Sequence, residues 1–429
     1  MKFQLAPFKV DVTCPIGHPL TVGWKEPAVG FADPLYAAGF ILLGDVKPVV
    51  LCAVDWSEIS NRSHIMWRES LAAAGTDADR VAVQTTHPHC SPWPDEDAQL
   101  LISQQEGVRH VMQPEFCHAA LANVAEGVRG AMSRPQSVTH IALGRAKVEK
   151  VASSRRVMGE DGKVKAVRWT VTKDPQVRAA PEGLIDPFLK SISFWNGDQK
   201  LAAAHYYAVH NTSYDNDDII TCDFLGLARE RRANDEPGVA HIFFNECAGN
   251  ITAGKYNDGA HENRKIFTNR VYAGIVAAEA TAERVAIDEF SWHVEPVFLP
   301  PGNDMNEPDM MAILDDPDAG VKERIKAAIK LAGLRRQDVP IPFGCLKFGD
   351  VAHILHLPGE SFIEYQLFAQ QQSTADWVAV PSYGDCGPGY ICMDKSYAEG
   401  GYEPVDSFVS PGVETVMKDA IAKLIGASE

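Results

Sequence analysis

Short apolar runs of strand length alternate with longer segments of helical periodicity along the whole chain. Residues 48–54 (PVVLCAV) form a continuous apolar run of the kind that a buried strand requires, and residues 60–74 have the spacing of an amphipathic helix. Asn196-Gly197-Asp198 separates two further strand-like runs, 189–195 and 201–209, and is a strong hairpin signal. Because β-then-α units and hairpins occur together, we expect an α/β protein of the mixed α+β kind, with mixed sheets flanked by helices.

The other predicted elements follow the same alternation. Strands are expected at 80–85, 239–244, 351–357 and 376–380, with short strands between 138 and 171. Helices are expected at 114–132, 261–285, from about 361, and 413–425. The acidic, Pro-rich stretch at 300–318 is expected to be a solvated surface loop, with a lid as the alternative. No internal repeat is detectable in the sequence.

The acidic balance of the chain excludes several classes of partner. With 40 Lys plus Arg and 57 Asp plus Glu, the net charge is −17, which disfavours nucleic acid and anionic membrane surfaces. No segment approaches 18 uninterrupted apolar residues, and the N-terminus lacks the apolar core of a secretory signal. The nine cysteines include no C-x-x-C pair and fit a reducing compartment. We therefore expect a cytoplasmic protein without stable membrane insertion; its oligomeric state is not predicted.

The densest group of reactive side chains is Thr85-Thr86-His87-Pro88-His89-Cys90-Ser91-Pro92, directly after the predicted strand at 80–85. Open α/β sheets place their sites at the carboxyl ends of strands, where this segment lies. Two imidazoles two residues apart can face one pocket, and histidine is the commonest metal ligand. His87 and His89 are therefore candidate site residues; the alternative is a pair of surface-loop histidines.

Two other predicted strands end in similar side chains. The run at 201–209 leads into His210, and the run at 351–357 leads into Pro358-Gly359-Glu360, where the glycine permits a sharp turn. Two histidines and one carboxylate around an open position form the ligand set of a catalytic zinc. Such a Zn²⁺ polarises a carbonyl and lowers the pKa of a bound water to about 7. Three histidines inside the strands are expected to pack rather than bind metal: His205, His353 and His356.

Two further motifs are weaker. Residues 249–256 (GNITAGKY) match G-x-x-x-x-G-K, but Tyr256 stands where a phosphate loop needs Ser or Thr to hold Mg²⁺, so nucleotide binding is not expected. Thr252 or Asn250, in the same segment, can still present a hydroxyl or an amide to the site. Cys90 beside His89 is a conceivable thiol nucleophile with a base, although neighbours in sequence rarely have the required geometry.

Taken together and in order, these motifs resemble the neutral (non-lysosomal) ceramidases and their bacterial relatives. That family has T-H-T-H-S-G-P, a second histidine block followed by S-S-D-x-x-G, then A-A-G-D-V-S-P, P-G-E and paired tyrosines. The corresponding segments here are 86–92 (THPHCSP), His210 with 221–226 (TCDFLG), 247–253 (CAGNITA), 358–360 (PGE), and Tyr390 with Tyr402. The resemblance extends over about residues 5–425.

The resemblance implies a fold and a set of site residues. The fold is the ceramidase-like catalytic domain, without the C-terminal immunoglobulin-like domain of family ceramidases. The implied zinc ligands are His87, His210, Glu360 and Tyr390. The implied catalytic residues are His89 facing the substrate, Tyr402 at the developing oxyanion, Arg155 (with Arg156 as the alternative) as the active-site arginine, and Thr252 in place of a catalytic serine. Because these ligands must meet at one centre, residues 1–429 are expected to form one domain, although the length alone allows about three.

Departures from the family pattern bear on the substrate. Cys90-Ser91 replaces Ser-Gly, Thr252 replaces the serine, and Asn250 replaces an aspartate. Our primary hypothesis is a zinc-dependent, ceramidase-like amidohydrolase that cleaves a small-molecule N-acyl amide with metal-activated water. The alternatives are a zinc-dependent esterase or other hydrolase, and a metal-binding homologue without catalysis. The charge and the N-terminus favour a soluble substrate over a membrane sphingolipid.

Overall fold

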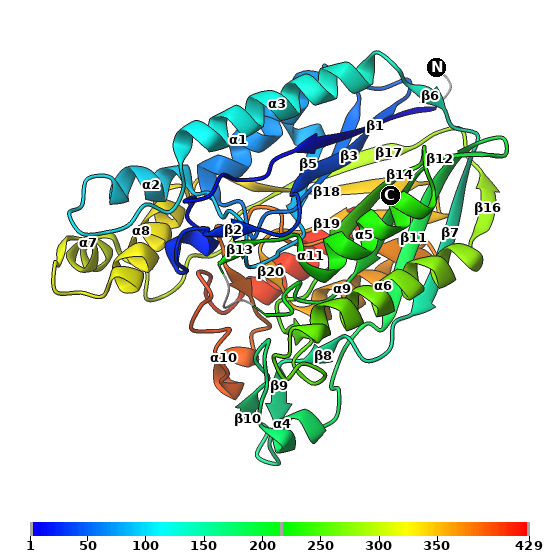
Figure 1. The fold of residues 1–429 in the computed structure, drawn as a ribbon. Coiled ribbons are helices and arrows are strands. Elements are labelled where there is room, and N and C mark those ends of the chain that lie inside the picture. The colour runs from blue at the N-terminus through cyan, green and yellow to red at the C-terminus, as the bar shows by residue number, and fades with distance from the viewer. Residues whose placement is uncertain (1–2, 215–217, 427–429) are drawn as a thin grey trace.

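Three mixed β-sheets form the frame of the computed structural model, which describes residues 3–214 and 218–426 (Figure 1). The first sheet has the order β5 (Val81–Thr85), β4 (Val49–Val54), β3 (Tyr36–Leu43), β1 (Gln4–Asp11), β6 (Gln136–Ser137). The second has the order β14 (Ala240–Asn245), β12 (Gln199–Tyr207), β11 (Phe188–Asn196), β7 (His140–Lys147), β16 (Glu283–Ala286). The third has the order β17 (Ser291–Val297), β18 (Ile341–Phe348), β19 (Ala352–His356), β21 (Trp377–Ala379).

The helices and the short strand pairs lie between and around these sheets. The helices are α1 (Asn61–Leu71), α2 (Glu96–Ile102), α3 (Pro114–Met132), α4 (Pro175–Ala179), α5 (Asp223–Asp235), α6 (Glu262–Ala280), α7 (Glu307–Asp315), α8 (Val321–Arg335), α9 (Ile363–Gln372), α10 (Ser396–Glu399) and α11 (Val413–Ile425). Three 3₁₀ turns are η1 (Thr21–Gly23), η2 (Ala72–Ala74) and η3 (Ala78–Arg80). The short pairs join β2 (Gly30–Phe31) to β13 (Ile219–Ile220), β8 (Ser153–Ser154) to β15 (Ile251–Thr252), β9 (Arg156–Met158) to β10 (Val164–Val167), and β20 (Glu360–Ser361) to β22 (Tyr390–Ile391).

Each sheet contains the same unit, a hairpin followed by a helix and a parallel edge strand. The three units are β3-β4-α1-β5, β11-β12-α5-β14 and β18-β19-α9-β21. In each, the last strand pairs in parallel with the second strand of the hairpin. A parallel connection requires a crossover, and here a helix supplies it. The repetition lies in the topology, since the sequence has no detectable repeat.

The inner faces of the three sheets pack against one another around three phenylalanines, one from the first strand of each unit. The ring centroids of Phe40 and Phe194 are 5.1 Å apart, and those of Phe194 and Phe348 are 6.1 Å apart. Helices cover the opposite faces: α1 and α3 the first sheet, α5 and α6 the second, α9 and α11 the third (Figure 1). This is the mixed architecture of sheets and flanking helices expected from the sequence.

The predicted helices at 114–132 and 413–425 are confirmed as α3 and α11. The helix predicted at 261–285 is wrong at its C-terminal end. Helix α6 stops at Ala280, and residues 283–286 form β16 on the edge of the second sheet. There Arg284 pairs with Ala142 and Val285 with Ile141 of β7. Pairing with β7 therefore overrides the helical pattern of residues 283–286. This is a tertiary effect, which the local sequence pattern does not predict.

The prediction of a surface loop at 300–318 is also wrong in part, because helix α7 occupies Glu307–Asp315. The Asn306 side chain caps this helix by accepting a hydrogen bond from the Asp309 amide. Pro308 lies in its first turn, where proline is tolerated. Met310 and Leu314 are buried in the core beside α8.

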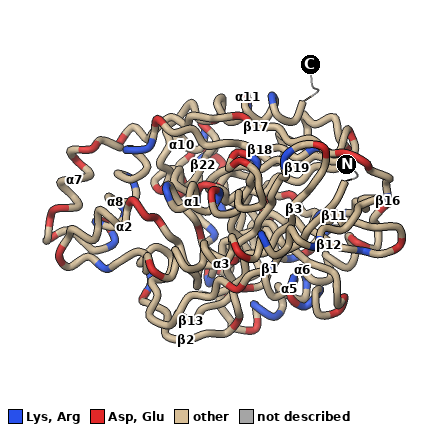
Figure 2. Tube along the Cα trace, turned by 90° about the horizontal axis from the view of Figure 1, so that it is seen from above, with Lys and Arg blue, Asp and Glu red and all other residues tan. Residues whose placement is uncertain are grey.

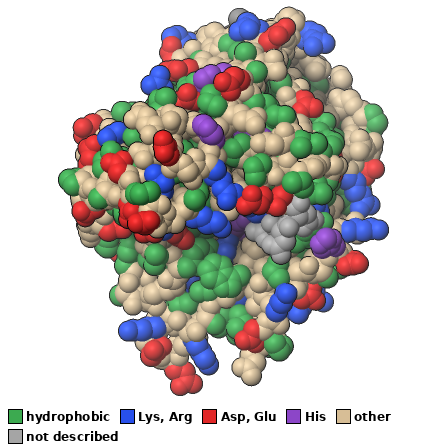
Figure 3. All heavy atoms as spheres, turned by 60° about the vertical axis from the view of Figure 1, so that its left-hand side comes forward, with side chains coloured by type: hydrophobic (Ala, Val, Ile, Leu, Met, Phe, Trp, Pro, Cys, Tyr) green, Lys and Arg blue, Asp and Glu red, His purple; other side chains and the backbone are tan. Residues whose placement is uncertain are grey.

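Charged residues lie mainly at the periphery, with acidic segments prominent along α7 (Figure 2). One face of the molecule is hollowed near its centre (Figure 3). Within the described ranges, no helix combines the length and the apolar character needed to cross a bilayer. Among the described residues, the ion pair of Arg229 and Asp55 has both side chains fully buried: the guanidinium from α5 donates to both oxygens of Asp55, directly after β4, at 2.8 Å each.

We expect Asp55→Asn to lower the free energy of unfolding by about 3 kcal/mol, because it leaves the buried charge of Arg229 with only the partly exposed Glu230 as counter-charge. Urea unfolding followed by tryptophan fluorescence measures the change. The control is Asp77→Asn, which breaks the exposed pair with Lys47 and is expected to cost less than about 0.5 kcal/mol. Equal losses in the two variants would contradict the structural role of the buried pair.

Candidate functional site

The carboxyl ends of the three parallel strand pairs meet at one place. The Thr85 amide at the end of β5 donates to the Tyr383 carbonyl at 2.9 Å, and the Ser382 amide donates to the Asn245 carbonyl at 3.0 Å. The Asn245 side chain donates to the Thr86 carbonyl at 3.4 Å. Loops from all three sheets are thus held together, and the predicted ligands lie in or next to these loops.

His87 and His210 are both buried and both oriented by backbone carbonyls. His87 Nδ1–H donates to the Ser57 carbonyl at 2.8 Å, and His210 Nδ1–H donates to the Ala248 carbonyl at 3.0 Å. Burial lowers the pKa of both imidazoles, so each ring is neutral and carries one proton. Because a carbonyl only accepts, that proton lies on Nδ1 in each ring. Both Nε2 atoms therefore present a lone pair.

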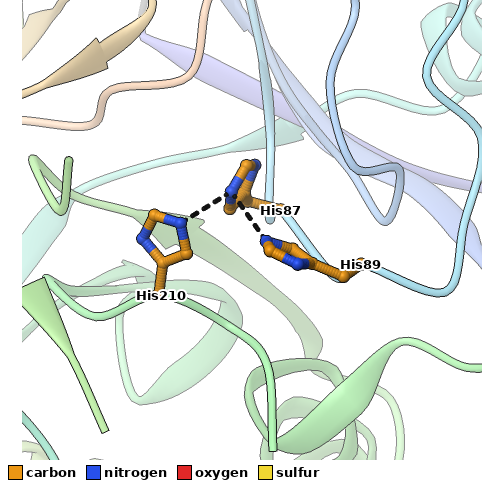
Figure 4. Close-up of side chains that lie close together, drawn as sticks. All are labelled: His87, His89 and His210. Carbon is orange, nitrogen blue, oxygen red and sulfur yellow. Dashed lines mark hydrogen bonds between the residues drawn. The ribbon is translucent and has the colours of Figure 1, made fainter. Parts of the chain in front are cut away.

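These two lone pairs point toward each other, since the Nε2 atoms of His87 and His210 are 3.2 Å apart (Figure 4). His89 Nε2 also lies 3.2 Å from His87 Nε2. Two acceptor nitrogens at this distance repel unless a cation lies between them. Ligands about 2.05 Å from a tetrahedral metal lie roughly 3.3 Å apart, which matches the observed spacing. A carbonyl on the second ring nitrogen is the usual outer-sphere partner of a metal-binding histidine.

Glu360 adds an oxygen to this group. Gly359, with φ +55°, turns the chain after β19, and a Cβ there would lie 2.7 Å from the Gly389 carbonyl oxygen. The turn places Glu360 Oε2 3.2 Å from His210 Nε2 and 3.6 Å from His87 Nε2. This buried oxygen accepts no hydrogen bond from the described residues. Burial raises the pKa of Glu360, opposed by Arg155 and a hydrogen bond from Tyr390.

Tyr390 reaches the group through the pairing of β20 with β22, in which Glu360 and Tyr390 are partners. Its hydroxyl lies 3.0 Å from that of Tyr402. The Arg155 guanidinium carbon is 5.4 Å from the centre of the Tyr402 ring. Burial raises the pKa of both tyrosines, so both phenols carry a proton. Two hydrogen-bond donors and a cation thus lie beside Glu360.

A cavity of about 540 Å³ opens above these residues. Its wall includes the side chains of His87, His89, Arg155, Glu360, Tyr390 and Tyr402. Much of the remaining wall is apolar or aromatic: Trp24, Trp93, Trp169, Val171 and Phe408. Trp169 packs against Tyr402 with ring centroids 4.7 Å apart. The cavity therefore joins a polar floor to walls suited to an apolar chain.

The two arginines of the 155–156 pair have different environments. Arg155 is buried and lines the cavity, whereas Arg156 forms ion pairs with Glu403 at 2.9 Å and Glu399 at 3.1 Å. This favours Arg155 as the site arginine. Thr252 is fully buried and is not part of the cavity wall. Its hydroxyl accepts a hydrogen bond from the Gly254 amide at 3.2 Å, and the catalytic role expected for it stays a prediction.

Sequence reasoning missed two side chains at the floor. Glu58 is buried with Oε1 3.8 Å from His87 Nδ1, and burial next to Glu360 raises its pKa. The Tyr383 ring packs against His87 with centroids 4.4 Å apart and the rings tilted by 30°, and its hydroxyl is 3.4 Å from His210 Nδ1. Glu58 follows the predicted strand at 48–54 by four residues, and that strand-end position was the available signal.

A second cluster of possible ligands lies where helix α6 covers the second sheet, and consists of His205, His241 and Glu279. Its carboxylate is already matched by cations, since Glu279 pairs with Lys200 and with Arg232. The two ring nitrogens of His205 form hydrogen bonds with Ser191 and with His241. The His205 side chain is buried within its strand, as expected. These contacts satisfy the cluster without a metal. A further group of possible metal ligands lies at the floor of the cavity and consists of Glu58, His87 and Glu360.

The fold is that of the bacterial neutral ceramidases. The crystal structure of neutral ceramidase from Pseudomonas aeruginosa superimposes with a TM-score of 0.72 over all of this chain and 76% of that one, at 16% identity. A ceramidase complexed with C2 superimposes with a TM-score of 0.71 over all of this chain and 77% of that one, also at 16% identity. No protein-family model matches the chain, and no curated protein matches it significantly in sequence.

We expect Gly359→Ala to lower the free energy of unfolding by more than the strain of a left-handed backbone conformation alone. Gly197, in the β11–β12 turn, has a similar φ of +57° but nothing within 4 Å of an added Cβ. Gly197→Ala should therefore lower the free energy of unfolding by about 1 kcal/mol, which is the strain of a left-handed residue. Gly359→Ala adds the contact with Gly389 and should lower it by about 2 kcal/mol more. Urea unfolding in the presence of a chelator compares the two; indistinguishable losses would speak against the close approach.

Proposed function

We propose that this chain is a zinc-dependent amidohydrolase that cleaves an N-acyl amide bond in a small molecule. The proposal rests on the Nε2 atoms of His87 and His210, which lie 3.2 Å apart beside the unpartnered Glu360 oxygen. Two imidazole nitrogens and a carboxylate suit zinc, and a catalytic zinc site also keeps one position free for water or substrate. The similarity in fold to bacterial neutral ceramidases supports an amide as the bond that is cleaved.

The residues His87, His210 and Glu360 would hold the zinc, with Tyr390 beside Glu360 as the fourth ligand. A bound zinc supplies a Lewis acid and lowers the pKa of a water molecule on it. His89 Nε2 is also within ligand distance of the group, at 3.2 Å from His87 Nε2. In this proposal it faces the cavity and protonates the leaving amine, the role that its place in the cavity wall permits.

Tyr402 and Arg155 stabilise negative charge on the substrate. The Tyr402 phenol stays protonated because burial raises its pKa, so it donates a hydrogen bond to the carbonyl oxygen as charge develops there. Arg155, buried behind the Tyr402 ring, adds a positive charge at short range. The aromatic walls exclude water and hold the acyl chain.

The metal content of the purified protein tests the ligand set. We expect about one zinc per chain in the wild type. The double variant His87→Ala plus His210→Ala is expected to retain less than about a tenth of it, because two of the proposed ligands are lost. His118→Ala is the control, since His118 is exposed and pairs only with Glu96 among the described residues. Absence of zinc from the wild type, or its retention in the double variant, refutes the zinc site.

Turnover of matched N-acyl amides and esters tests the reaction. We expect amide hydrolysis, with kcat lowered about 10²- to 10³-fold in Tyr402→Phe and KM little changed, because the phenol acts on the developing oxyanion. Tyr397→Phe is the control: its hydroxyl bonds Ser407 and the Val409 carbonyl, away from the cavity wall. Hydrolysis of esters alone would make the protein an esterase, and no turnover despite bound zinc would make it a non-catalytic homologue.

A further inference from the structure

The charged side chains of the cavity wall are balanced in number. Three are cationic and three are anionic: Lys25, Arg155 and Lys322 against Glu58, Glu360 and Asp406. Because neither sign is in excess, these side chains do not select a substrate by its charge. Selection is then left to the size of the cavity and to its apolar wall.

The volume of the cavity limits what it can enclose. A water molecule or a methylene group occupies about 30 Å³ in a liquid, so a cavity of about 540 Å³ holds roughly 20 non-hydrogen atoms. An N-acyl amide with one chain of about ten carbons on a small amine has roughly 15 to 20 such atoms and fills this space. A two-chain amide such as N-palmitoylsphingosine has about 40, so about half of its atoms would lie outside the cavity.

Trp169 spans one wall of the cavity from the floor to the surface. Its ring packs on Tyr402 with centroids 4.7 Å apart, and the Tyr402 hydroxyl lies 3.0 Å from that of Tyr390 at the floor. Trp169 is nevertheless 53% exposed. A single tryptophan therefore covers the distance from the floor to solvent along this wall. A chain that lies against it has only a short enclosed path.

The segment that carries Trp169 is fixed at both ends. On one side, the Arg168 amide donates to the Arg155 carbonyl at 2.8 Å, and the buried Arg168 guanidinium donates to four further backbone carbonyls. On the other side, the Thr172 amide donates to the Asn257 carbonyl at 2.9 Å, and the Asn257 side chain donates to another carbonyl of this segment at 2.8 Å. A wall held in this way does not move aside to enclose a longer chain.

We propose that the substrate is a single-chain N-acyl amide with an acyl chain of about ten carbons, and that Trp169 limits the length of this chain. This inference rests on the proposed function and specifies its substrate class. The amide lies at the floor beside Tyr402 and Arg155, and the acyl chain lies along Trp169 and Val171 toward the surface. The reaction is the hydrolysis of one C–N bond: the hydroxyl of one water molecule joins the carbonyl carbon, the nitrogen gains a hydrogen, and a carboxylic acid and a free amine are the products.

The test uses N-acylethanolamines with chains from about 4 to about 18 carbons, at concentrations at which every probe is monomeric. We expect wild-type kcat/KM to rise about two- to fourfold per added methylene while the chain is enclosed, because each methylene is removed from water. The rise should stop at about ten carbons, since further methylenes lie in solvent. A rise that continues to the longest chain overturns the length limit.

Variants of Trp169 test its role through the chain length at which the rise stops. Trp169→Ala should move this point to longer chains by about two to four carbons, because the missing ring leaves space for them. Trp169→Phe, which keeps a ring, should move it less. Phe298→Ala is the control, since Phe298 is 56% exposed and is not part of the cavity wall. An unchanged point in Trp169→Ala, or an equal change in Phe298→Ala, overturns the assignment of Trp169.

Binding of the same series, measured by calorimetry, separates this inference from the proposed function. An affinity that stops rising at about ten carbons, and at longer chains in Trp169→Ala, supports the substrate class even where no amide is hydrolysed; then only the proposed reaction fails. Hydrolysis of the whole series without such a point, in rate or in affinity, overturns the medium-chain substrate and leaves the amidohydrolase standing. A preference for N-palmitoylsphingosine over every single-chain probe also overturns it.

Discussion

The hydrogen bonds that join the strand ends of the three sheets are the interaction on which the site depends. Thr85, Asn245 and Ser382 use their backbone or side-chain groups to tie one sheet to the next at the point where the parallel strands end. Backbone groups buried at such a junction must find partners, so the loops that follow have little freedom. That restriction lets His87 adopt φ of 62° and lets two imidazoles keep their lone pairs facing each other.

The threefold repetition of one topological unit explains why a site arises there. The units pack around Phe40, Phe194 and Phe348, so their parallel pairs end at a common centre. The first unit contributes His87 after β5, the second His210 after β12, and the third Glu360 after β19. Each unit thus supplies one of the three groups that surround the proposed metal position.

Electrostatics divides the site into two regions. The buried floor brings together groups whose pKa values are shifted by burial, which favours neutral imidazoles and protonated phenols. The rest of the cavity wall carries three further charged side chains: Lys25, Lys322 and Asp406.

Much of this could be predicted from local patterns. Apolar runs and their flanking residues predicted α3, α11, the β11–β12 hairpin and the strand-end positions of His87, His210 and Glu360. Strands β1, β3, β17 and β18 and helices α5 and α8 were not predicted. The change from helix to strand at β16 and the helix within 300–318 were missed, because sheet pairing and packing on α8 decided them. Glu58 was missed because its role depends on a parallel neighbour, β5, that comes later in the chain.

The sequence by itself determined which residues could act, since it set the chemical types at the strand ends and the Gly359 that lets Glu360 turn inward. Only the tertiary structure decided which of them meet. It placed Arg155 at the cavity and Arg156 in an ion pair, left Thr252 outside the wall, and brought Glu58 to the same cavity as His87 and Glu360. The physical reason is that distance along the chain carries no information on distance across sheets, which packing of the three units alone establishes.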